Sequence, residues 1–360
     1  MRRIAYLAVA VLMLGVGACT SDDKKPEAAP SASAASPSPS VQVSPTPPAG
    51  VDIKGPLNIL IAGIDNRESI PNWIPRSDAL MILHVNADLS KAYLTSLPRD
   101  LVVNVPAFPP AKFGGERTKL THAMMYGSRV PGTKKPSVQQ GYQLMAKTVS
   151  GYTGIPKFDG GAVLTFRGLT KLVDALGGID VYVDQKVVSI HRQPDGKVRP
   201  GCSRCEHGYS GPRMTYNVGN MHMVGWQALD YARQRYTNGG DYTRQRHQRQ
   251  IIEAAVGKIL QGDFLSNPAS IDKVVGALGE MLTVVGMQPV ALAYALRNLT
   301  PQSITQVGLP GSGAYSGSRY IGENLSSAPQ KSYFQALRQD KLDAWAAANK
   351  KYVNVGSPQG

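Results

Sequence analysis

The feature that most constrains the fold is a short and largely apolar run, Leu57–Ile64 (LNILIAGI), with Gly63 near its end. An apolar run of this length predicts a buried strand. Further strands are predicted at 79–86, 91–97, 101–106, 179–183 and 303–310, and helices at 137–154, 165–178, 225–232, 241–261, 288–298 and 330–349. Strands mixed with helices in this way predict an α/β fold, with a sheet covered on both faces.

The N-terminus has the layout of an export signal. A basic start is followed by an apolar run from Ile4 to Gly17, which is short for a membrane span and typical of a secretory signal peptide. The run ends in VGAC, which resembles a bacterial lipobox, so we expect a lipoprotein signal over 1–18 and lipidation of Cys19. An ordinary signal peptide or short anchor is the alternative. Residues 19–52 are rich in Pro, Ser and Ala and read as a tether ahead of a domain at 53–355.

The chain carries a formal net charge of +14. A basic balance suits nucleic acid, an anionic membrane face or a polyanionic substrate. The export signal argues against nucleic acid, and so does the absence of a helix-turn-helix or zinc-finger pattern. The expected location is the outer face of a bacterial cytoplasmic membrane.

The two remaining cysteines, Cys202 and Cys205, stand in the sequence GCSRCEHG. In an exported protein such a pair predicts a small disulfide loop. A zinc site is the alternative, although His207 is the single further ligand nearby. The surrounding segment 185–224 has little periodicity and predicts a long surface excursion, pinned by the cysteine pair.

The stretch 231–250 crowds five arginines around the start of a predicted helix. At roughly 100° per residue, Arg244 and Gln248 fall on the stripe that faces the core, whereas Arg246 and Arg249 fall toward solvent. An inward arginine needs a partner, since burying a lone charge is costly. Asp241, at the expected N-cap position, can serve both the helix start and Arg244.

Just before this helix, the sequence YARQR places Arg233 and Arg235 one residue apart. In an extended chain the two arginines share a side and form a clamp suited to phosphate oxygens. A helical continuation would splay them apart, and the residues alone favour neither arrangement.

Two aspartates stand at predicted strand ends: Asp65 follows the first strand and Asp78 opens the next. Carboxylates on the rim of an α/β sheet lie where ligands bind, and a pair of them can hold Mg²⁺ while leaving room for phosphate. Arg67 and Arg76 lie nearby in the sequence, so structural Asp–Arg salt bridges are the alternative.

Taken together and in order, the motifs resemble those of the LytR–CpsA–Psr family of exported bacterial cell-wall ligases, in an actinobacterial-type lipoprotein form. The matching segments within residues 57–260 are NILIAGIDNR, RSDALMILHVN, SLPRDLVVNVP, KLTHAMMYG, LVDALGGIDVYV, GWQALDYARQR and GDYTRQRHQRQ. The resemblance implies a three-layer α/β/α sandwich with a central mixed sheet. It implies Mg²⁺-dependent transfer of a glycopolymer phosphate from a polyprenyl pyrophosphate carrier onto a peptidoglycan hydroxyl.

The resemblance also assigns residues. Asp65 and Asp78 match the metal-binding aspartates, and Arg99, Asp100 and Asp241 are the catalytic candidates. The residues expected around the pyrophosphate are Arg76, Arg99, Lys119, Arg233, Arg235, Arg244 and Gln248. The apolar stretches Leu164–Phe166, Leu169–Leu176 and Ile251–Leu260 either line a pocket for the lipid tail or form ordinary core.

The sequence departs from the family pattern at His247, Thr121 and the pair Thr165–Phe166, none of which is a matched site residue. A polyprenyl pyrophosphatase, and a non-catalytic lipid carrier or regulator, are the alternative functions. The segment after Gly262 looks helical and continuous with the main fold, so we expect no additional C-terminal domain. The polymer, the acceptor position and the oligomeric state are not indicated by the sequence.

Overall fold

The structure is a computed structural model that describes residues 50–356 except 51, 67–69, 71 and 262–267. The expected signal peptide over 1–18, the lipidation site Cys19 and nearly all of the tether over 19–52 lie outside the described residues, as does Arg67. Among the described residues, no helix combines the length and apolar character needed to cross a membrane.

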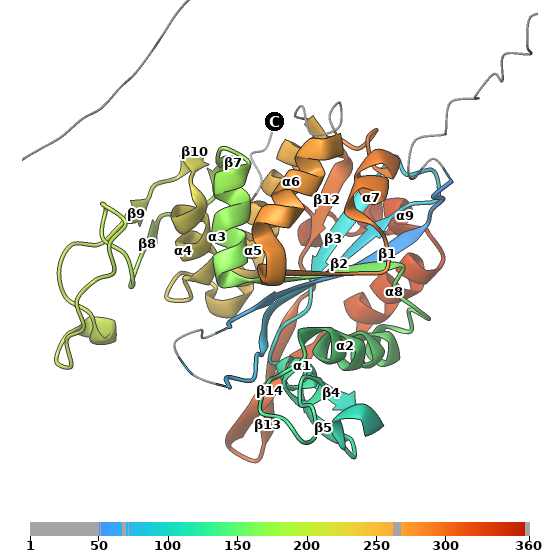
Figure 1. Cartoon of the computed structure of the whole chain (residues 1–360), viewed down its shortest axis with the longest axis horizontal. Coiled ribbons are helices and arrows are strands. Elements are labelled where there is room, and N and C mark those ends of the chain that lie inside the picture. The colour runs from blue at the N-terminus through green and yellow to red at the C-terminus, as the bar shows by residue number, and fades with distance from the viewer. Residues whose placement is uncertain (1–49, 51, 67–69, 71, 262–267, 357–360) are drawn as a thin grey trace, which may run out of the picture. The chain divides into compact units, whose positions relative to one another are not determined.

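A six-stranded mixed sheet forms the centre of the molecule, in the order β11-β6-β1-β2-β3-β12 (Figure 1). Strand β1 pairs parallel with β6 and antiparallel with β2, and β3 pairs parallel with β12. The strands are β1 (Leu57–Ile64), β2 (Ser77–Val85), β3 (Ala92–Ser96), β6 (Gly160–Thr165), β11 (Leu282–Val285) and β12 (Ile304–Val307). The expected central mixed sheet is confirmed.

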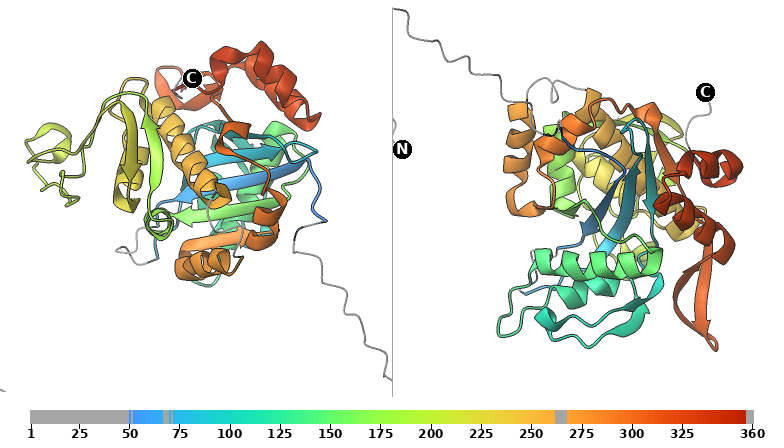
Figure 2. Two further views of the ribbon diagram at one scale, coloured as in Figure 1. Left: turned by 90° about the horizontal axis from the view of Figure 1, so that it is seen from above. Right: turned by 90° about the vertical axis from the view of Figure 1, so that its right-hand side faces the viewer.

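Helices cover both faces of this sheet, because alternate side chains of each strand point to opposite faces. Leu60, Ala62 and Ile64 of β1 pack into one core together with helices α1 (Thr121–Gly127), α2 (Val138–Thr153), α8 (Ser327–Arg338) and α9 (Leu342–Ala348). Ile59 and Ile61 face the other side, toward helices α3 (Phe166–Ala175), α5 (Gly240–Gln261), α6 (Pro268–Leu278) and α7 (Pro289–Ala295). The result is the expected three-layer α/β/α arrangement (Figure 2).

In the part of the chain that the structure describes, four two-stranded ribbons lie outside the central sheet. They are β4 (Val102–Val105) with β5 (Glu116–Lys119), β7 (Ile179–Val183) with β10 (Gly219–Met223), β8 (Val187–Val188) with β9 (Thr215–Tyr216), and β13 (Gly311–Ser316) with β14 (Arg319–Leu325). Helix α4 (Gly225–Arg233) packs against α3 and α5. The β7–β10 ribbon, α3, α4 and α5 share a second core around Val181 and Tyr231.

Most of the expected elements are present, and one expectation needs correction. The segment after Gly262 contains the helices α6–α9 and, in β12, the strand expected at 303–310, but it also supplies β11, an outer strand of the central sheet, and the β13–β14 hairpin, which were not expected. Its short strands lack the alternation of a half-buried strand, which is why the sequence pattern did not reveal all of them.

Candidate active site

The two candidate metal-binding aspartates stand at the same end of one strand pair. Strands β1 and β2 are antiparallel, with Ile64 opposite Ser77 and a register shift beside it. Asp65 follows Ile64 and Asp78 follows Ser77, so the register brings both residues to the same end of these two central strands, called the edge of the sheet below. The backbone carbonyl of Asp65 accepts a hydrogen bond from the indole of Trp73 at 3.0 Å.

Arg99 links this edge to the β4–β5 ribbon. Its Nη1 donates to Asp78 Oδ1 at 2.6 Å, and its Nε lies 3.8 Å from Asp100 Oδ2. Asp100 Oδ1 is in turn 3.4 Å from Lys119 Nζ, because Lys119 pairs across the ribbon with Val102. Burial opposes the charge of Arg99, but Asp78 and Asp100 together raise the pKa of its guanidinium.

The N-terminus of α5 brings the second set of charges. The helix begins at Gly240, so Asp241 lies in its first turn rather than at the expected N-cap, a position that still favours a carboxylate. Asp241 Oδ1 lies 2.9 Å from Arg244 Nη2 and 4.0 Å from Arg235 Nε, and Oδ2 accepts from Gln245 Nε2 at 3.2 Å.

Arg244 is the inward arginine that the helical phase predicts, at 3% exposure. Burial lowers the pKa of Arg244 to about 10, with Asp241 opposing the shift and Arg235 and Arg99 adding to it, so the side chain stays charged at neutral pH. Its Nε and Nη2 have no hydrogen-bond acceptor among the described residues, since the contact with Asp241 lacks hydrogen-bond geometry. A buried cation with unused donors is suited to an anion.

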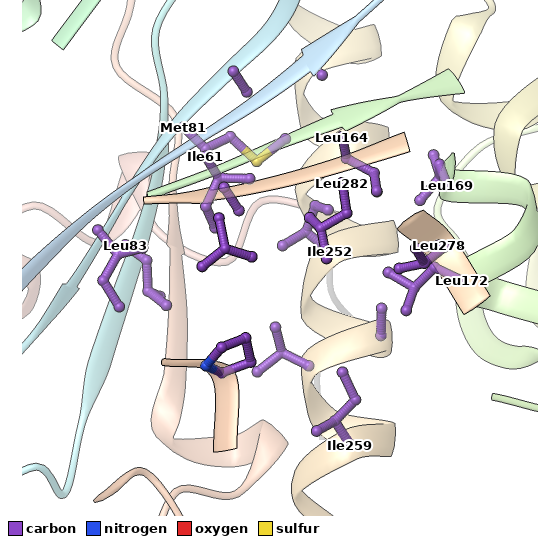
Figure 3. Close-up of a pocket in the computed structure, with 18 of the residues that line it drawn as sticks. Ile61, Met81, Leu83, Leu164, Leu169, Leu172, Ile252, Ile259, Leu278 and Leu282 are labelled. Carbon is purple, nitrogen blue, oxygen red and sulfur yellow. The ribbon is translucent and has the colours of Figure 1, made fainter. Parts of the chain in front are cut away.

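An apolar cavity of about 320 Å³ opens beside these charges (Figure 3). It lies between one face of the sheet and helices α3, α5, α6 and α7, and its few polar lining residues are Thr165, Arg233 and Gln248. The aliphatic side chains that Figure 3 labels around it are Ile61, Met81, Leu83, Leu164, Leu169, Leu172, Ile252, Ile259, Leu278 and Leu282. All three apolar stretches proposed from the sequence therefore contribute to a cavity and not only to core.

Arg233 and Gln248 mark the polar end of this cavity. The guanidinium of Arg233 lies over the ring of Phe166 at 4.9 Å, and Gln248 Nε2 donates to the carbonyl of Ala232 at 3.4 Å. Helix α4 continues to Arg233, so Arg233 and Arg235 do not form the extended two-arginine clamp. Arg233 instead faces the cavity, whereas Arg235 faces Asp241.

Charge interactions relate the predicted residues to one another. The charges of Arg99 and Asp78 act on Arg244, and that of Asp241 acts on Arg99. Arg76 is exposed and donates a weak hydrogen bond to Met125 Sδ at 3.4 Å. Burial lowers the pKa of His122, and the charges of Arg76 and Lys119 lower it further. The predicted site residues thus gather around one edge of the sheet, and the position of Asp65 there follows from strand register.

Comparison with known proteins decides the family. The model of the LytR_cpsA_psr family matches residues 17–341. The chain belongs to the LytR_cpsA_psr family. It is 30% identical to the polyisoprenyl-teichoic acid–peptidoglycan teichoic acid transferase TagU of Enterococcus faecalis, and the match covers 67% of this chain and 66% of that protein. It is also 30% identical, over 59% of its length, to 46% of biofilm regulatory protein A of Streptococcus mutans. The chain therefore spans less than the whole of each relative.

The fold of a solved family member agrees with this assignment. The crystal structure of B. subtilis TagV superimposes with a TM-score of 0.60 at 23% identity, and the match covers 80% of this chain and 98% of that one. At this identity the likeness is a likeness of fold.

The donor set at the sheet edge fits a magnesium ion. Among the described residues no group of three or more His, Cys, Asp or Glu side chains is placed to hold a metal. Two carboxylates, Asp65 and Asp78, are nevertheless what Mg²⁺ requires from a protein when substrate phosphate and water complete its shell. In this structure one oxygen of Asp78 accepts from Arg99.

Two surface arginines predicted from the helical phase of α5 are not on the surface in this LytR_cpsA_psr protein. Arg246 Nη2 lies 2.5 Å from Asp184 Oδ2, and Arg249 is 4% exposed. The prediction is wrong because α5 is covered on more than one side. The end of β7 supplies Asp184, and β12 supplies Gln306, which donates to Glu253.

The excursion over 185–224 is present, and Cys202 and Cys205 form the expected disulfide, with an S–S distance of 2.04 Å. The disulfide joins residues only three positions apart, so it does not pin the excursion. Buried Arg199 holds it instead, donating to the carbonyls of Ile190, Tyr209 and Gly211 at 2.9, 3.1 and 3.2 Å.

Sequence reasoning missed a polar group beside the site. Tyr242 and Tyr320 both donate to Glu323, at 3.0 and 2.7 Å, and Lys119 Nζ lies 5.1 Å from the centre of the Tyr320 ring. His122, on α1, bonds to Thr118 at 2.8 Å, and burial together with Arg76 and Lys119 lowers its pKa. The position of Tyr242 next to Asp241 was the available signal for the first of these residues.

Proposed function

We propose that this protein transfers a glycopolymer phosphate from a polyprenyl pyrophosphate carrier onto a hydroxyl of peptidoglycan. One observation carries the proposal: an apolar cavity opens at Arg233 and Gln248 beside the cations Arg99 and Arg244. The apolar lining suits an isoprenoid tail, and the cations suit a pyrophosphate. The name of the relative from E. faecalis, a polyisoprenyl-teichoic acid–peptidoglycan teichoic acid transferase, supports this donor and acceptor class.

The positively charged side chains beside the cavity provide most of what the reaction requires from the protein. Phosphoryl transfer requires positioning and charge neutralisation more than covalent help from the protein. The acceptor oxygen forms a bond to the phosphorus that carries the sugar, the bond from that phosphorus to the bridging oxygen breaks, and polyprenyl phosphate leaves. Arg99, Arg244 and Lys119 bind the phosphate oxygens, with Arg76, Arg235 and Gln248 around them.

The two remaining acidic candidates have different roles. Asp241 orients Arg244, from which it lies 2.9 Å away. Asp100 lies between Arg99 and Lys119, on the side of the β4–β5 ribbon. It is our candidate for the carboxylate that takes the proton of the acceptor hydroxyl.

We propose Asp65 and Asp78 as the ligands of a magnesium ion. Bound there, Mg²⁺ would supply positive charge to the phosphate oxygens. Arg99, which contacts Asp78, would add its own charge to the same phosphate.

We further propose that the protein is exported and held on the outer face of the membrane through lipid on Cys19. Support comes from the basic and apolar start of the chain and from the sequence VGAC that ends it. The Pro-rich segment over 19–52 would let the domain reach the wall. Labelling with a clickable palmitate, and its loss in Cys19→Ala, tests the anchor.

The function is tested with purified protein, Mg²⁺, a lipid-pyrophosphate-linked oligosaccharide and peptidoglycan fragments. Mass spectrometry should detect a phosphodiester-joined product together with polyprenyl phosphate. Release of lipid phosphate without a joined product would instead support a pyrophosphatase. Binding of lipid without any release would support a carrier.

The cavity itself is tested with Val256→Phe, which places a larger side chain in its lining. Turnover of a long-chain donor should fall about tenfold, whereas that of a donor with a short lipid should change little. Val256→Leu, a smaller change at the same position, serves as the control. Equal losses with both donors would contradict a tail site.

A further inference from the structure

The β13–β14 hairpin displays two aromatic side chains that the phosphate chemistry does not use. Tyr315 is 63% exposed and Tyr320 is 42% exposed, and Ile321 beside them is 37% exposed. Tyr315 and Tyr320 are cross-strand partners whose rings meet edge to face, with centroids 5.7 Å apart. Large aromatic groups gathered on an accessible surface indicate an interaction site.

This hairpin is fastened to the active site. Glu323 N donates to the carbonyl of Asp100 at 2.8 Å, and Leu101 bridges to Glu323. Gly322, with φ +152°, permits the contact, since a Cβ at that position would lie 2.4 Å from the carbonyl oxygen of Asp100. The hairpin therefore holds a fixed position relative to Asp100.

Side chains continue the connection. Glu323 accepts hydrogen bonds from Tyr320 and from Tyr242, the residue after Asp241. Lys119, which lies 3.4 Å from Asp100, also lies over the ring of Tyr320. Tyr320 is therefore a direct neighbour of Lys119, one of the proposed phosphate-binding cations.

The groups of the site consequently form a sequence from the cavity to the hairpin. The cavity lining includes Gln248, about one helical turn after Arg244 on α5. Arg99 lies near Arg244, Asp100 and Lys119 follow it, and Tyr320 and Tyr315 come last. In Figure 1 and in the right-hand view of Figure 2, the hairpin extends on the opposite side of the central sheet from α6 and α7, which enclose the cavity.

We propose that Tyr315 and Tyr320 form the subsite for the glycan of the peptidoglycan acceptor, an inference that rests on the proposed function. In a phosphoryl transfer the attacking and leaving oxygens lie roughly in line on opposite sides of the phosphorus. The leaving lipid phosphate lies toward the cavity, so the acceptor hydroxyl arrives from the side of the hairpin. The faces of sugar rings carry C–H groups that pack on aromatic rings, and two exposed tyrosines offer such a surface.

Glu323 is a positioning residue in this subsite. By accepting from Tyr242 and Tyr320 together, its carboxylate fixes the Tyr320 ring relative to α5 and to Lys119. Glu323→Gln keeps one acceptor oxygen, and its amide nitrogen can donate to the other tyrosine hydroxyl, so the acceptor dependence should change little. Glu323→Ala removes both contacts and should weaken the acceptor dependence as Tyr320→Ala does.

The test measures initial rates of joined product against the concentration of a peptidoglycan oligosaccharide, at a saturating lipid-pyrophosphate donor. A second series varies the donor at a fixed acceptor concentration. In Tyr315→Ala the half-saturating acceptor concentration should rise about tenfold, while the half-saturating donor concentration and the slow release of lipid phosphate without acceptor stay unchanged. Tyr315→Phe keeps the ring and should behave as the wild type does. Unchanged thermal unfolding of the exposed variants shows that the fold is intact.

The matched control is Tyr294→Ala. Tyr294 also carries a cation over its ring, Arg297 at 4.1 Å, but belongs to α7 on the cavity side of the sheet. The variant Tyr294→Ala should leave the half-saturating acceptor concentration unchanged. A rise in the half-saturating donor concentration of Tyr315→Ala would assign the hairpin to the donor and overturn the proposal, as would unaltered acceptor dependence in an active wild-type background. No product from the wild type with any acceptor would instead contradict the proposed function itself.

Discussion

Helix α5 carries two buried arginines in two different regions of the molecule, and they differ in their surroundings rather than in their own properties. Arg244 is 3% exposed and Arg249 is 4% exposed. Burial lowers the pKa of each to about 10, so both are charged at neutral pH. Residue type, burial and charge therefore do not separate a binding residue from a structural one.

The neighbours separate them. Arg244 faces other cations, Arg235 and Arg99, with Asp241 as its ion-pair partner, at the edge of the sheet where the cavity opens. Arg249 lies among Arg246, Glu253, Tyr333 and the backbone at Gly308, where a Cβ would stand 3.1 Å from Arg249 Nη2. The charge of Arg246 is paired with Asp184 at 2.5 Å, so Glu253 remains to compensate Arg249. Cations that gather without such compensation indicate a place for an anion.

The largest effect is expected at Arg244. In Arg244→Met the rate of transfer should fall about 1,000-fold, because a pre-positioned cation on the phosphate is lost. The melting temperature should stay within a few degrees of the wild-type value, since Arg244 has unused donors in the folded protein. Product formation and thermal unfolding are measured together.

Arg244→Lys is the matched control, because lysine keeps the charge and loses the planar fork. It should recover part of the lost rate. A fully active Arg244→Met would place the phosphate elsewhere and remove the distinction between the two arginines.

Arg249 should show the reverse behaviour. In Arg249→Met the free energy of unfolding should fall by about 3 kcal/mol, because Glu253 loses its compensating charge inside the fold. The rate per folded molecule should change by less than a few fold. Denaturant unfolding gives the free energy, and the transfer assay at a temperature where the variant is folded gives the rate.

The double variant Arg249→Met/Glu253→Leu sharpens this result. Removing two opposite charges from the interior together is often neutral, so stability should return toward the wild-type value. A double variant as unstable as the single one would show that Arg249 acts through packing or through the backbone at Gly308, and not through Glu253.

The sequence was sufficient for one of these arginines and not for the other. The inward position of Arg244 follows from the helical phase of Ile252, Ala255 and Val256, which are neighbours on the same helix. Arg249 was misplaced because its cover comes from β12 and α8, whose residues are distant in sequence. A helical projection identifies one core-facing stripe, and α5 is covered on a second side as well.

The same limit applies to the fold and to the rest of the site. The strand β1 was predicted with its observed bounds, Leu57–Ile64, because an apolar run is local information. The β13–β14 hairpin was not predicted, since its glycine-rich strands have no alternation of apolar residues. The contact between Tyr242 and Glu323 spans 81 positions, and no local pattern records such a pairing.

The smallest expected effect is a pH dependence of the unfolding free energy that arises near Arg249 and not near Arg244. Burial raises the pKa of Glu253 to about 6, against 4.5 for the unperturbed group, with Gln306 and Arg249 opposing the shift. A raised pKa in the folded state gives stability that is present below the unfolded value and is lost as the pH rises through the folded value. Between pH 4.5 and 7 the wild type should therefore lose about 2 kcal/mol of unfolding free energy from this group.

Glu253→Gln, which cannot ionise, should not show this loss, and the difference between the two denaturant-unfolding curves should grow with pH. Because Glu253 belongs to the surroundings of Arg249 and not to those of Arg244, the pH profile of transfer should be the same in both proteins. Two stability curves that stay parallel from pH 4.5 to 7 would mean that Glu253 ionises freely, and that Arg249 is compensated by another group.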